Sequence, residues 1–471
     1  MSQKLKTQKS CSQFCKTATR DLGTVRNVYT ESGRNMRIST FKILMLTVIG
    51  CAMAVLFVLN AKMHLFDSAA VLWEKPSAFP VPDLRDISVT TGAILSVRNS
   101  TALLVSAYLD ERFSSRTVRI IAIVKRSQVP QFYCQFYNSS WLVTVRAKVL
   151  IHPDHFSFPY GTAFIMCQMP NKAEVAPYVS VTTTMSPKSA GPFLRIRPVS
   201  RGRSLTYPRQ FSVCISTLYG NYSNILQFVQ SLEMYRILGA QKVFVYKSDC
   251  SPMLQRVLDF YVAEGFIEVI AWDIQHYLSV SRSWLPSLDP GQLHYYGQVA
   301  TLNDCVYRNM PESRYVVLND IDEVVVPILH HDWVEMMNAL SSAHLGVESF
   351  QIENSVFRTS VTGDTGEFNL WGQVPGVNVL QHVHREPYRR FTFNACKMIV
   401  NPRAVVWTSV HKVSWHVGAS MWVPASVARL HHCRTDDDMK VREKDLIRDT
   451  TIWKYSSSLI KNVNHVLKEA L

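Results

Sequence analysis

The sequence predicts an α/β protein with a mostly parallel sheet flanked by helices, preceded by an all-β, sandwich-like domain and one transmembrane helix. Three patterns support this prediction: strand–helix alternation after residue 207, short strands without helical periodicity in residues 86–200, and an uncharged apolar run at residues 43–59. The chain has 471 residues, enough for two or three domains, and its 47% hydrophobic content supports well-packed cores.

Residues 1–42 form a basic tail. They contain nine Lys and Arg residues against two Asp and Glu residues, which leaves +7, half of the formal net charge of +14. Because the excess charge lies in a tail, and no basic stripe with interleaved aromatic residues occurs elsewhere, the sequence argues against nucleic-acid binding.

An apolar segment follows the tail directly. Its 17 uncharged residues, 43–59, reach the lower limit for spanning a bilayer, and we expect a signal-anchor over residues 43–61. A cleaved signal peptide is disfavoured, because the segment starts more than 40 residues into the chain, behind a long polar segment, and no clear small-x-small cleavage site follows. The basic flank predicts a single-pass type II protein with a cytoplasmic tail, and the short span favours the Golgi or ER.

Sequons and cysteines support a lumenal placement of the remaining chain. Seven of the ten cysteines lie beyond the apolar segment without zinc spacing, so some are expected to pair in an oxidising compartment. Cys134 and Cys167 are candidates for one pair, whereas Cys214 is expected to be an inert buried thiol in a core strand. The Asn-x-Ser/Thr sequons begin at Asn99, Asn138 and Asn221.

Residues 62–85 contain three prolines and no sustained apolar period, which is typical of a stem. Residues 86–200 predict a β-rich accessory domain, with short strands separated by Pro, Asn and Ser turns. No catalytic constellation occurs there, so the domain is expected to support the fold, with carbohydrate binding as the alternative. The expected strands cover residues 101–109, 118–124, 132–137, 141–145, 148–151 and 162–167.

Strands and helices alternate in residues 207–435, which predicts a parallel, doubly wound sheet. The helix at residues 223–238 has apolar residues at helical spacing and ends at Gly239, and the next helix begins with the cap Ser251 and Pro252. The other expected elements are strands at residues 211–217, 242–247, 266–272 and 314–319, and a helix at residues 292–308.

Ligands of such sheets bind beyond the carboxyl ends of the strands. Four strand ends, including Asp273, are therefore expected to converge, and we expect Thr217, Tyr219 and Lys247 to contact a bound nucleotide. Neither a Gly-x-Gly-x-x-Gly fingerprint nor a P-loop follows any strand, and no Gly-x-Ser-x-Gly elbow occurs. These absences exclude a dinucleotide-binding domain and disfavour a serine hydrolase.

Two carboxylates, Asp320 and Asp322, stand at the end of the fourth strand. Residues i and i+2 of a strand point the same way, and two converging carboxylates repel unless a cation lies between them. Hard oxygen ligands suit Mg²⁺ or Mn²⁺, which would bridge the phosphates of a nucleotide. The alternative is a polar loop that only caps a buried strand.

Several segments of this region, in this order, resemble glycosyltransferase family 92, whose members include β-1,4-galactosyltransferases. The resemblance covers residues 207–435, about half of the chain. The segments that carry it are Cys214–Gly220, Tyr235–Ala240, Gly265–Trp272, Gly297–Arg308 and Asp320–Pro327.

The resemblance implies a GT-A fold, a UDP-sugar donor with UDP-galactose as the best-known example, a glycan acceptor and inversion at the anomeric carbon. It also implies Mn²⁺ or Mg²⁺ held by Asp320 and Asp322. The negative charge that builds on the departing diphosphate is what such a metal stabilises. A glycan-binding or scaffold protein that retained the fold without catalysis is the alternative function, and a homodimer remains open.

Enzymes with a GT-A fold commonly complete the metal or diphosphate site with a histidine from the C-terminal half. His411 and His432 are the candidates here, and Cys433 stands where relatives tend to carry tyrosine. Lys397 and Arg434 are candidates for phosphate contacts.

An inverting transferase needs a general base for the acceptor hydroxyl, and the sequence does not choose among four carboxylates. Residues 436–471 are expected to form a helical tail whose apolar stripe packs on the domain or on a partner, with Asp436–Asp438 capping its start. The four candidate bases are Glu323, Asp364, Glu367 and Glu386.

Overall fold

The computed structural model describes residues 94–113, 115–138, 141–169, 175–185, 193–200, 206–362, 366–388, 393–434 and 441–471, all within a compact unit of residues 71–471. The predicted tail, the span at residues 43–61 and the stem lie outside the described residues, as does the acidic run at residues 436–438. In the part of the chain that is described, no helix is long and apolar enough to cross a bilayer.

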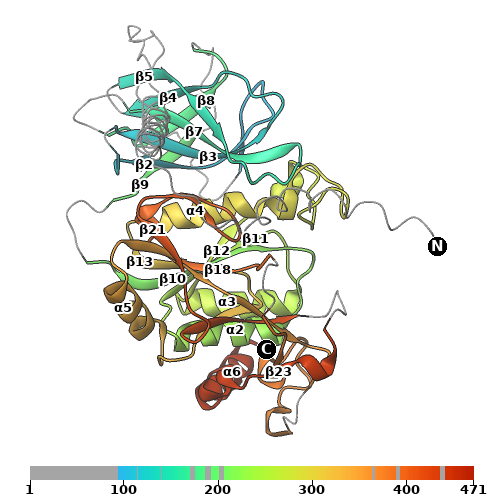
Figure 1. The fold of residues 1–471 in the computed structure, drawn as a ribbon. Helices are drawn as coiled ribbons and strands as arrows, with labels where there is room; N and C mark the ends of the chain where they lie inside the picture. The colour runs from blue at the N-terminus through green and yellow to red at the C-terminus, as the bar shows by residue number, and fades with distance from the viewer. Residues whose placement is uncertain are drawn as a thin grey trace, which may run out of the picture. The chain divides into compact units, whose positions relative to one another are not determined.

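A seven-stranded sheet forms the centre of the C-terminal part (Figure 1), with strand order β12-β11-β10-β13-β18-β15-β21. The first four of these strands are mutually parallel, and β18 (Lys397–Val400) runs antiparallel to β13. This arrangement confirms the predicted α/β fold with a mostly parallel central sheet. The parallel strands are β10 (Arg209–Leu218), β11 (Lys242–Lys247), β12 (Ile267–Ala271) and β13 (Ser313–Asn319).

Alternate residues of these strands enter two different cores. On β10, Val213 faces one core, and the next residue, Cys214, faces the other. Four helices pack in the first core and α4 (Gln298–Asn309) in the second, so α4 lies on the opposite face of the sheet from α2 and α3 (Figure 1). The helices of the first face are α2 (Ile225–Ile237), α3 (Pro252–Ala263), α5 (Trp333–Ala343) and α6 (Ser456–Ala470).

The helix boundaries follow from local chemistry. The Ser251 side chain accepts a hydrogen bond from the backbone N–H of Leu254 at the start of α3, as the Ser-Pro signal predicts. The Asp332 side chain likewise accepts a hydrogen bond from the backbone N–H of Glu335 at the start of α5. In the C-terminal helix α6, Val463 and Val466 are buried against the domain itself, one of the two placements expected for its apolar stripe.

The accessory part contains nine strands that pair in one continuous path, β5-β4-β8-β9-β2-β3-β7-β6, with β1 added to β2. The sandwich-like domain expected from the sequence is thus built from one continuous path of strands that curls on itself. The strands are β1 (Leu95–Ser96), β2 (Leu103–Asp110), β3 (Thr117–Lys125), β4 (Tyr133–Asn138), β5 (Trp141–Arg146), β6 (Lys148–Ile151), β7 (Tyr160–Gln168), β8 (Tyr178–Thr182) and β9 (Phe193–Pro198).

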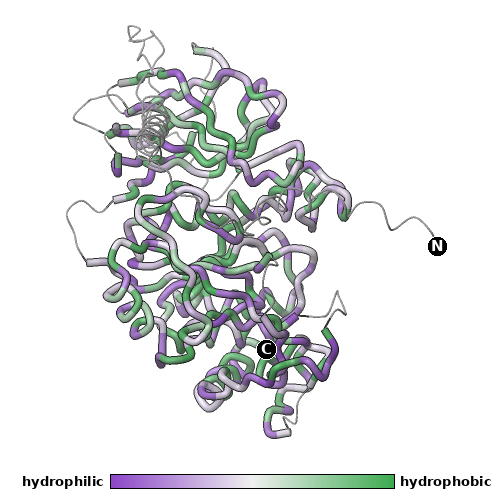
Figure 2. Tube along the Cα trace, viewed as in Figure 1, coloured by the Kyte–Doolittle hydropathy of each residue, from purple (hydrophilic) through white to green (hydrophobic). Residues whose placement is uncertain are grey.

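The curl is evident from a disulfide. Cys134 on β4 and Cys167 on β7 are bonded, although four other strands separate β4 from β7 in the pairing order. Inward-facing residues of both ends, such as Phe136 and Ile165, share one core, and Figure 2 shows hydrophobic residues following the strands. The candidate pairing of Cys134 with Cys167 is thus confirmed.

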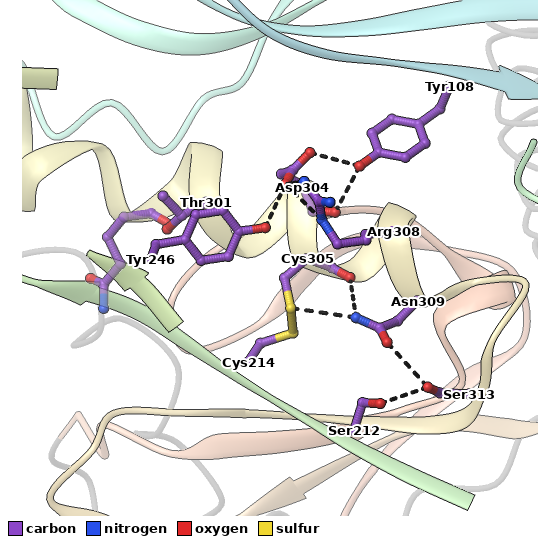
Figure 3. The surroundings of a disulfide bond; sticks show 11 residues. Tyr108, Ser212, Cys214, Tyr246, Thr301, Asp304, Cys305, Arg308, Asn309 and Ser313 are labelled. Atoms are coloured by element: carbon purple, nitrogen blue, oxygen red, sulfur yellow. Dashed lines mark hydrogen bonds and ion pairs between the residues drawn. A yellow bond between two sulfur atoms is a disulfide. The ribbon is translucent and has the colours of Figure 1, made fainter. Parts of the chain in front are cut away.

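Cys214 is not a free thiol, contrary to the sequence-based expectation. It forms a disulfide with Cys305, which lies 91 residues later on α4 (Figure 3). The strand pattern around Cys214 correctly indicated burial, but nothing local to it identifies a helix packed across the sheet. The bond ties β10 directly to α4.

A smaller sheet completes the domain beside the end of β13, with strand order β14-β22-β16-β17-β23. A separate hairpin joins β19 (Val405–Thr408) to β20 (Val413–His416). The strands of the smaller sheet are β14 (Glu323–Pro327), β16 (Asn354–Arg358), β17 (His384–Arg385), β22 (Ala428–Arg434) and β23 (Ile447–Arg448); the outer strands of the central sheet are β15 (Val347–Ile352) and β21 (Ala419–Trp422).

Candidate functional site

The turn Asp320–Asp322 connects β13 of the central sheet to β14 of the smaller sheet. Glu323 stabilises the geometry of this turn, because its Oε2 accepts a hydrogen bond from the Asp320 backbone N–H at 2.9 Å. The hydroxyl of Tyr235 on α2 donates to the Glu323 carbonyl at 2.6 Å. The two aspartates are therefore held on a preorganised turn at the carboxyl end of a parallel strand, where ligands of such sheets bind.

A buried lysine neutralises part of this cluster. Lys397 on β18 places Nζ 2.6 Å from Asp320 Oδ2 and 3.3 Å from Glu323 Oε2, and only 2% of its side chain is exposed. Burial alone would lower the pKa of Lys397, but the carboxylates of Asp320 and Glu323 outweigh it and raise the pKa above its usual value. Lys397 therefore stays charged.

Asp322 faces a histidine instead. The Nε2 atom of His432 lies 3.1 Å from Asp322 Oδ2, and strand pairing places His432 opposite Glu323. Burial opposes ionisation of both groups, yet their hydrogen bond outweighs it, so the pKa of Asp322 is lowered and that of His432 is raised. About a third of the Asp322 side chain remains exposed, so it can still reach a ligand.

Glu323 lies behind both aspartates and is almost fully buried. Burial is the largest influence on its pKa, which rises to about 7 because the nearby Asp320 charge adds to burial and outweighs the stabilising charge of Lys397. Three acidic groups thus share one buried lysine and one histidine, and the raised pKa of Glu323 reflects a crowding of negative charge that a cation would also relieve.

The start of α4 contributes a third side of the site. Gln298 donates its amide N–H to Asp320 Oδ1 at 3.0 Å and to Ser216 Oγ at 2.8 Å. The three preceding residues adopt left-handed backbone conformations, with φ of 37° at Tyr295, 51° at Tyr296 and 76° at Gly297. Such strain in non-glycine residues persists only where surrounding structure enforces it, and it concentrates at functional sites.

An aromatic pair borders this turn. The ring of Tyr219, just beyond β10, stacks on that of Tyr296 with 4.2 Å between centroids. Burial raises the pKa of Tyr219 to about 12, with Tyr295 and Asp320 adding to the effect. Thr217 is also at this strand end, and its hydroxyl is buried without a hydrogen-bond partner among the described atoms. The predicted contacts Thr217 and Tyr219 therefore adjoin the carboxylate turn.

Other predicted residues have different surroundings. Lys247 donates to Gln255 on α3 at 2.6 Å, so its ammonium is already held by a side chain of the fold. His411 donates through Nδ1 to the Cys396 carbonyl at 3.0 Å, and burial, reinforced by Lys397, lowers its pKa to about 4. A neutral His411 presents Nε2 as an acceptor. Arg434 is exposed at the end of β22, two residues after His432.

The four candidate bases have different surroundings. Asp364 lies outside the described residues. Glu367 is exposed on the turn Gly366–Phe368, whose Phe368 ring packs against Trp453. Glu323 is enclosed behind the aspartates, as described above. Glu386 lies after β17 and accepts two hydrogen bonds from the Arg358 guanidinium, at 3.1 Å and 2.8 Å.

Strand register places Glu386 on the His432 side of the smaller sheet. In the parallel pair of β16 and β22, Val356 lies opposite His432 and Arg358 opposite Arg434. Residues two apart on a strand share a face, so Arg358 and His432 project to the same side. The Glu386 backbone N–H also donates to the Val356 carbonyl at 2.9 Å.

The residues suit a divalent cation at Asp322 rather than between the two aspartates. Within the described ranges no group of three or more acidic, histidine or cysteine side chains is arranged to hold one ion, and Asp320 is engaged by Lys397. Asp322 and His432 nevertheless supply oxygen and nitrogen donors side by side. The buried Nδ1 of His432 has no hydrogen-bond partner among the residues that the structure describes, and it lies 3.5 Å from Glu323 Oε1, the relation in which a carboxylate orients a metal-bound histidine.

Sequence reasoning missed Gln298, Ser216 and Tyr295. The available signal for Gln298 was the glycine before it, Gly297, which interrupts the helix predicted over residues 292–308. That signal could be used only with the knowledge that this end of the helix meets the Asp320–Asp322 turn, and the sequence alone does not show this contact.

Similarity to known proteins covers the region around this site. The sequence model of glycosyltransferase family 92 matches residues 209–463. Two proteins of Caenorhabditis elegans are similar to the chain: the β-1,4-galactosyltransferase galt-1, 27% identical over 125 residues, and the glycosyltransferase family 92 protein F13G3.3, 24% identical over 243 residues.

These similarities are partial. They cover 26% and 50% of this chain, and 27% and 45% of the two relatives, so the chain spans less than half of the length of either. Among solved structures, S. aureus TarS in complex with UDP-GlcNAc is similar over 49% of this chain and 60% of that chain, with 12% identity and a TM-score of 0.29.

Proposed function

Because the chain belongs to glycosyltransferase family 92, we propose that it transfers a hexose, galactose before others, from a UDP-sugar to a hydroxyl group of a glycan, with inversion and with a divalent metal. The observation that carries the proposal is the turn Asp320–Asp322, with Asp322 beside His432 and Asp320 beside buried Lys397. The name of galt-1 supports galactose as the sugar.

Each group of the site has a role in this reaction. Asp322 and His432 would hold Mn²⁺ or Mg²⁺, which supplies positive charge to the diphosphate of the leaving UDP. Lys397 would hold the Asp320 carboxylate in place beside the donor, and Arg434 would meet phosphate oxygens beside His432. Tyr219 and Thr217 would bind the nucleoside at the end of β10.

The acceptor hydroxyl must lose a proton, and we assign that proton to Glu386. Its carboxylate is oriented by Arg358, is partly exposed, and lies on the His432 side of the smaller sheet. Glu323 is too enclosed to meet an acceptor, and Glu367 lies near Trp453 instead. The acceptor proton would pass to the Glu386 carboxylate as the hydroxyl oxygen bonds to the anomeric carbon and the bond to UDP breaks.

Glu386→Gln is expected to lower kcat by about 10²-fold, because the amide keeps the shape and the contact with Arg358 but accepts no proton. Steady-state kinetics at saturating donor checks this. Glu367→Gln is the matched control and is expected to keep the wild-type rate. Equal activity of the Glu386→Gln and wild-type proteins would show that another group takes the proton.

We also propose a Golgi or ER location with a lumenal catalytic domain, anchored by residues 43–61. The sequons and the basic flank of that segment support this, and the two disulfides fit an oxidising compartment.

A donor panel tests the function. UDP release is expected from UDP-galactose in the presence of Mn²⁺ and a glycan acceptor, to fall to background with EDTA, and to return when Mn²⁺ is added in excess. Absence of turnover with every UDP-sugar, combined with glycan binding that needs neither metal nor nucleotide, would instead indicate a non-catalytic glycan-binding protein.

A further inference from the structure

Helix α4 is enclosed between the two sheets. Every residue of α4 except Arg308 is buried. Its residues Val299 and Val306 share one hydrophobic core with Phe244 of the central sheet and with Ile121 and Phe164 of the accessory sheet. A short helix with so little exposed surface takes its position from both neighbours.

Polar contacts join α4 to the accessory sheet at Asp304. Its carboxylate accepts hydrogen bonds from the hydroxyls of Ser106 and Tyr108 on β2, and from Tyr246 on β11. Figure 3 shows Tyr108 and Tyr246 approaching Asp304 from different sides, with Arg308 next to it. Two of the three hydroxyl donors of this buried carboxylate therefore come from the accessory sheet.

Asp304 depends on these donors. Burial would raise the pKa of Asp304, but Arg308 and the hydroxyls of Ser106, Tyr108 and Tyr246 outweigh it and lower the pKa to about 2. A buried carboxylate that loses hydrogen-bond donors must move or recruit water, because an unsatisfied buried charge is costly. Loss of the accessory donors is thus transmitted to the helix backbone.

The N-terminus of α4 is held by the accessory sheet as well. A Cβ atom on Gly297 would lie 3.1 Å from Leu293, 3.2 Å from Trp272 and 3.6 Å from Ile123 of β3. Trp272 also donates its indole N–H to the Tyr296 carbonyl at 2.6 Å. The strained turn that directs Gln298 toward Asp320 therefore packs against Trp272, which follows β12, and against Ile123 of the accessory sheet.

We propose that the accessory sheet positions Asp320 through α4, with Asp304 and Gln298 as positioning residues. The proposal rests on the proposed function in so far as Asp320 belongs to the donor site. It assigns the accessory sheet a role in donor binding rather than that of a separate glycan-binding module. A purely structural role would lower the stability of the fold without altering the carboxylate turn.

The test removes the accessory donors in the full chain with the double variant Ser106→Ala/Tyr108→Phe. We expect about a tenfold rise in KM for the UDP-sugar, with a smaller effect on kcat, because Asp320 is less well placed for the donor. Tyr137→Phe is the matched control: Tyr137 is a buried residue of β4 whose hydroxyl donates to Gln135 at 3.1 Å and whose ring packs edge-on against Phe193 of β9.

The substitution Gln298→Leu provides a second kinetic test of the proposal. If the contacts act in series, Gln298→Leu raises the donor KM by a similar factor, and adding Ser106→Ala/Tyr108→Phe to it produces little further rise. Multiplicative effects would overturn the proposal. The single variants Ser106→Ala and Tyr108→Phe, each expected to show a smaller shift in the same direction, replace the double variant if it does not fold.

Amide hydrogen exchange tests the proposal without turnover. In the ligand-free chain the Asp320 backbone N–H donates a hydrogen bond to the Glu323 carboxylate. We expect this amide to exchange faster in Ser106→Ala/Tyr108→Phe than in Tyr137→Phe, when each rate is normalised to the slowest core amides of the same variant. Unchanged protection of Asp320 would overturn the role of α4 even if the wild-type protein is an active transferase. Lack of transferase activity with increased exchange would count against the proposed function alone.

Discussion

Asp322→Asn is expected to lower kcat/KM for sugar transfer by about 10³-fold while the protein stays folded. Asparagine has the size of aspartate and still accepts a hydrogen bond from His432, but it removes the negative charge that would hold the metal. The Mn²⁺ concentration needed for half-maximal activity is expected to rise as well. Kinetics over a Mn²⁺ series, with thermal unfolding to verify folding, measures both effects.

Asp259→Asn is the control for this substitution. Asp259 is on α3 and accepts a hydrogen bond from Gln255 at 2.7 Å, on the face of the central sheet opposite α4. Its substitution is expected to leave kcat/KM within twofold of wild type, a change well below 1 kcal/mol. An Asp322→Asn protein with wild-type kinetics and an unchanged Mn²⁺ requirement would rule out Asp322 as a metal ligand.

Lys397→Met is expected to lower the free energy of unfolding by about 3–5 kcal/mol, because it removes the partner of a buried carboxylate. Lys397 and Glu323 are each only 2% exposed, so solvent cannot replace the lost charge. Asp320 also loses its strongest contact, and sugar transfer is expected to fall with stability. Chemical denaturation of the purified variants measures the stability change.

Two comparisons show whether the stability loss of Lys397→Met comes from the buried ion pair. Lys412→Met removes an exposed lysine that lies 3.4 Å from Asp154, and it is expected to cost less than about 1 kcal/mol. Lys397→Met combined with Glu323→Gln is expected to recover part of the loss, because one buried charge disappears with its partner. A cost for Lys397→Met as small as that for Lys412→Met would contradict the description of a buried ionic cluster.

Local patterns predicted much of the catalytic part. The strands β10 to β13 and the helices α2 and α3 occur close to their expected residues, because periodicity and capping residues such as Ser251 act locally. The helix expected over residues 292–308 begins only at Gln298, because the left-handed residues Tyr295–Gly297 interrupt it. The carboxylate pair was also visible, since its residues adjoin a hydrophobic run. The accessory strands were located as well, but their pairing into one curled sheet depends on contacts that no single strand encodes.

The partners of the carboxylates were not predictable in the same way. Asp320 and Asp322 were expected to point together as residues i and i+2 of a strand, but both belong to a turn that follows β13. Their side chains consequently meet different groups, Lys397 and His432, which lie 77 and 110 residues away in the sequence. The disulfide of Cys214 escaped prediction for the same reason.

Crystals of the protein grown with UDP and Mn²⁺ would show directly whether Asp322 and His432 hold the metal, because the anomalous scattering of manganese identifies the position of the ion. We expect a peak within bonding distance of the Asp322 carboxylate and of His432 Nε2, next to the UDP diphosphate, with Asp320 still bonded to Lys397. Bound UDP without such a peak, or a peak elsewhere in the molecule, would contradict it.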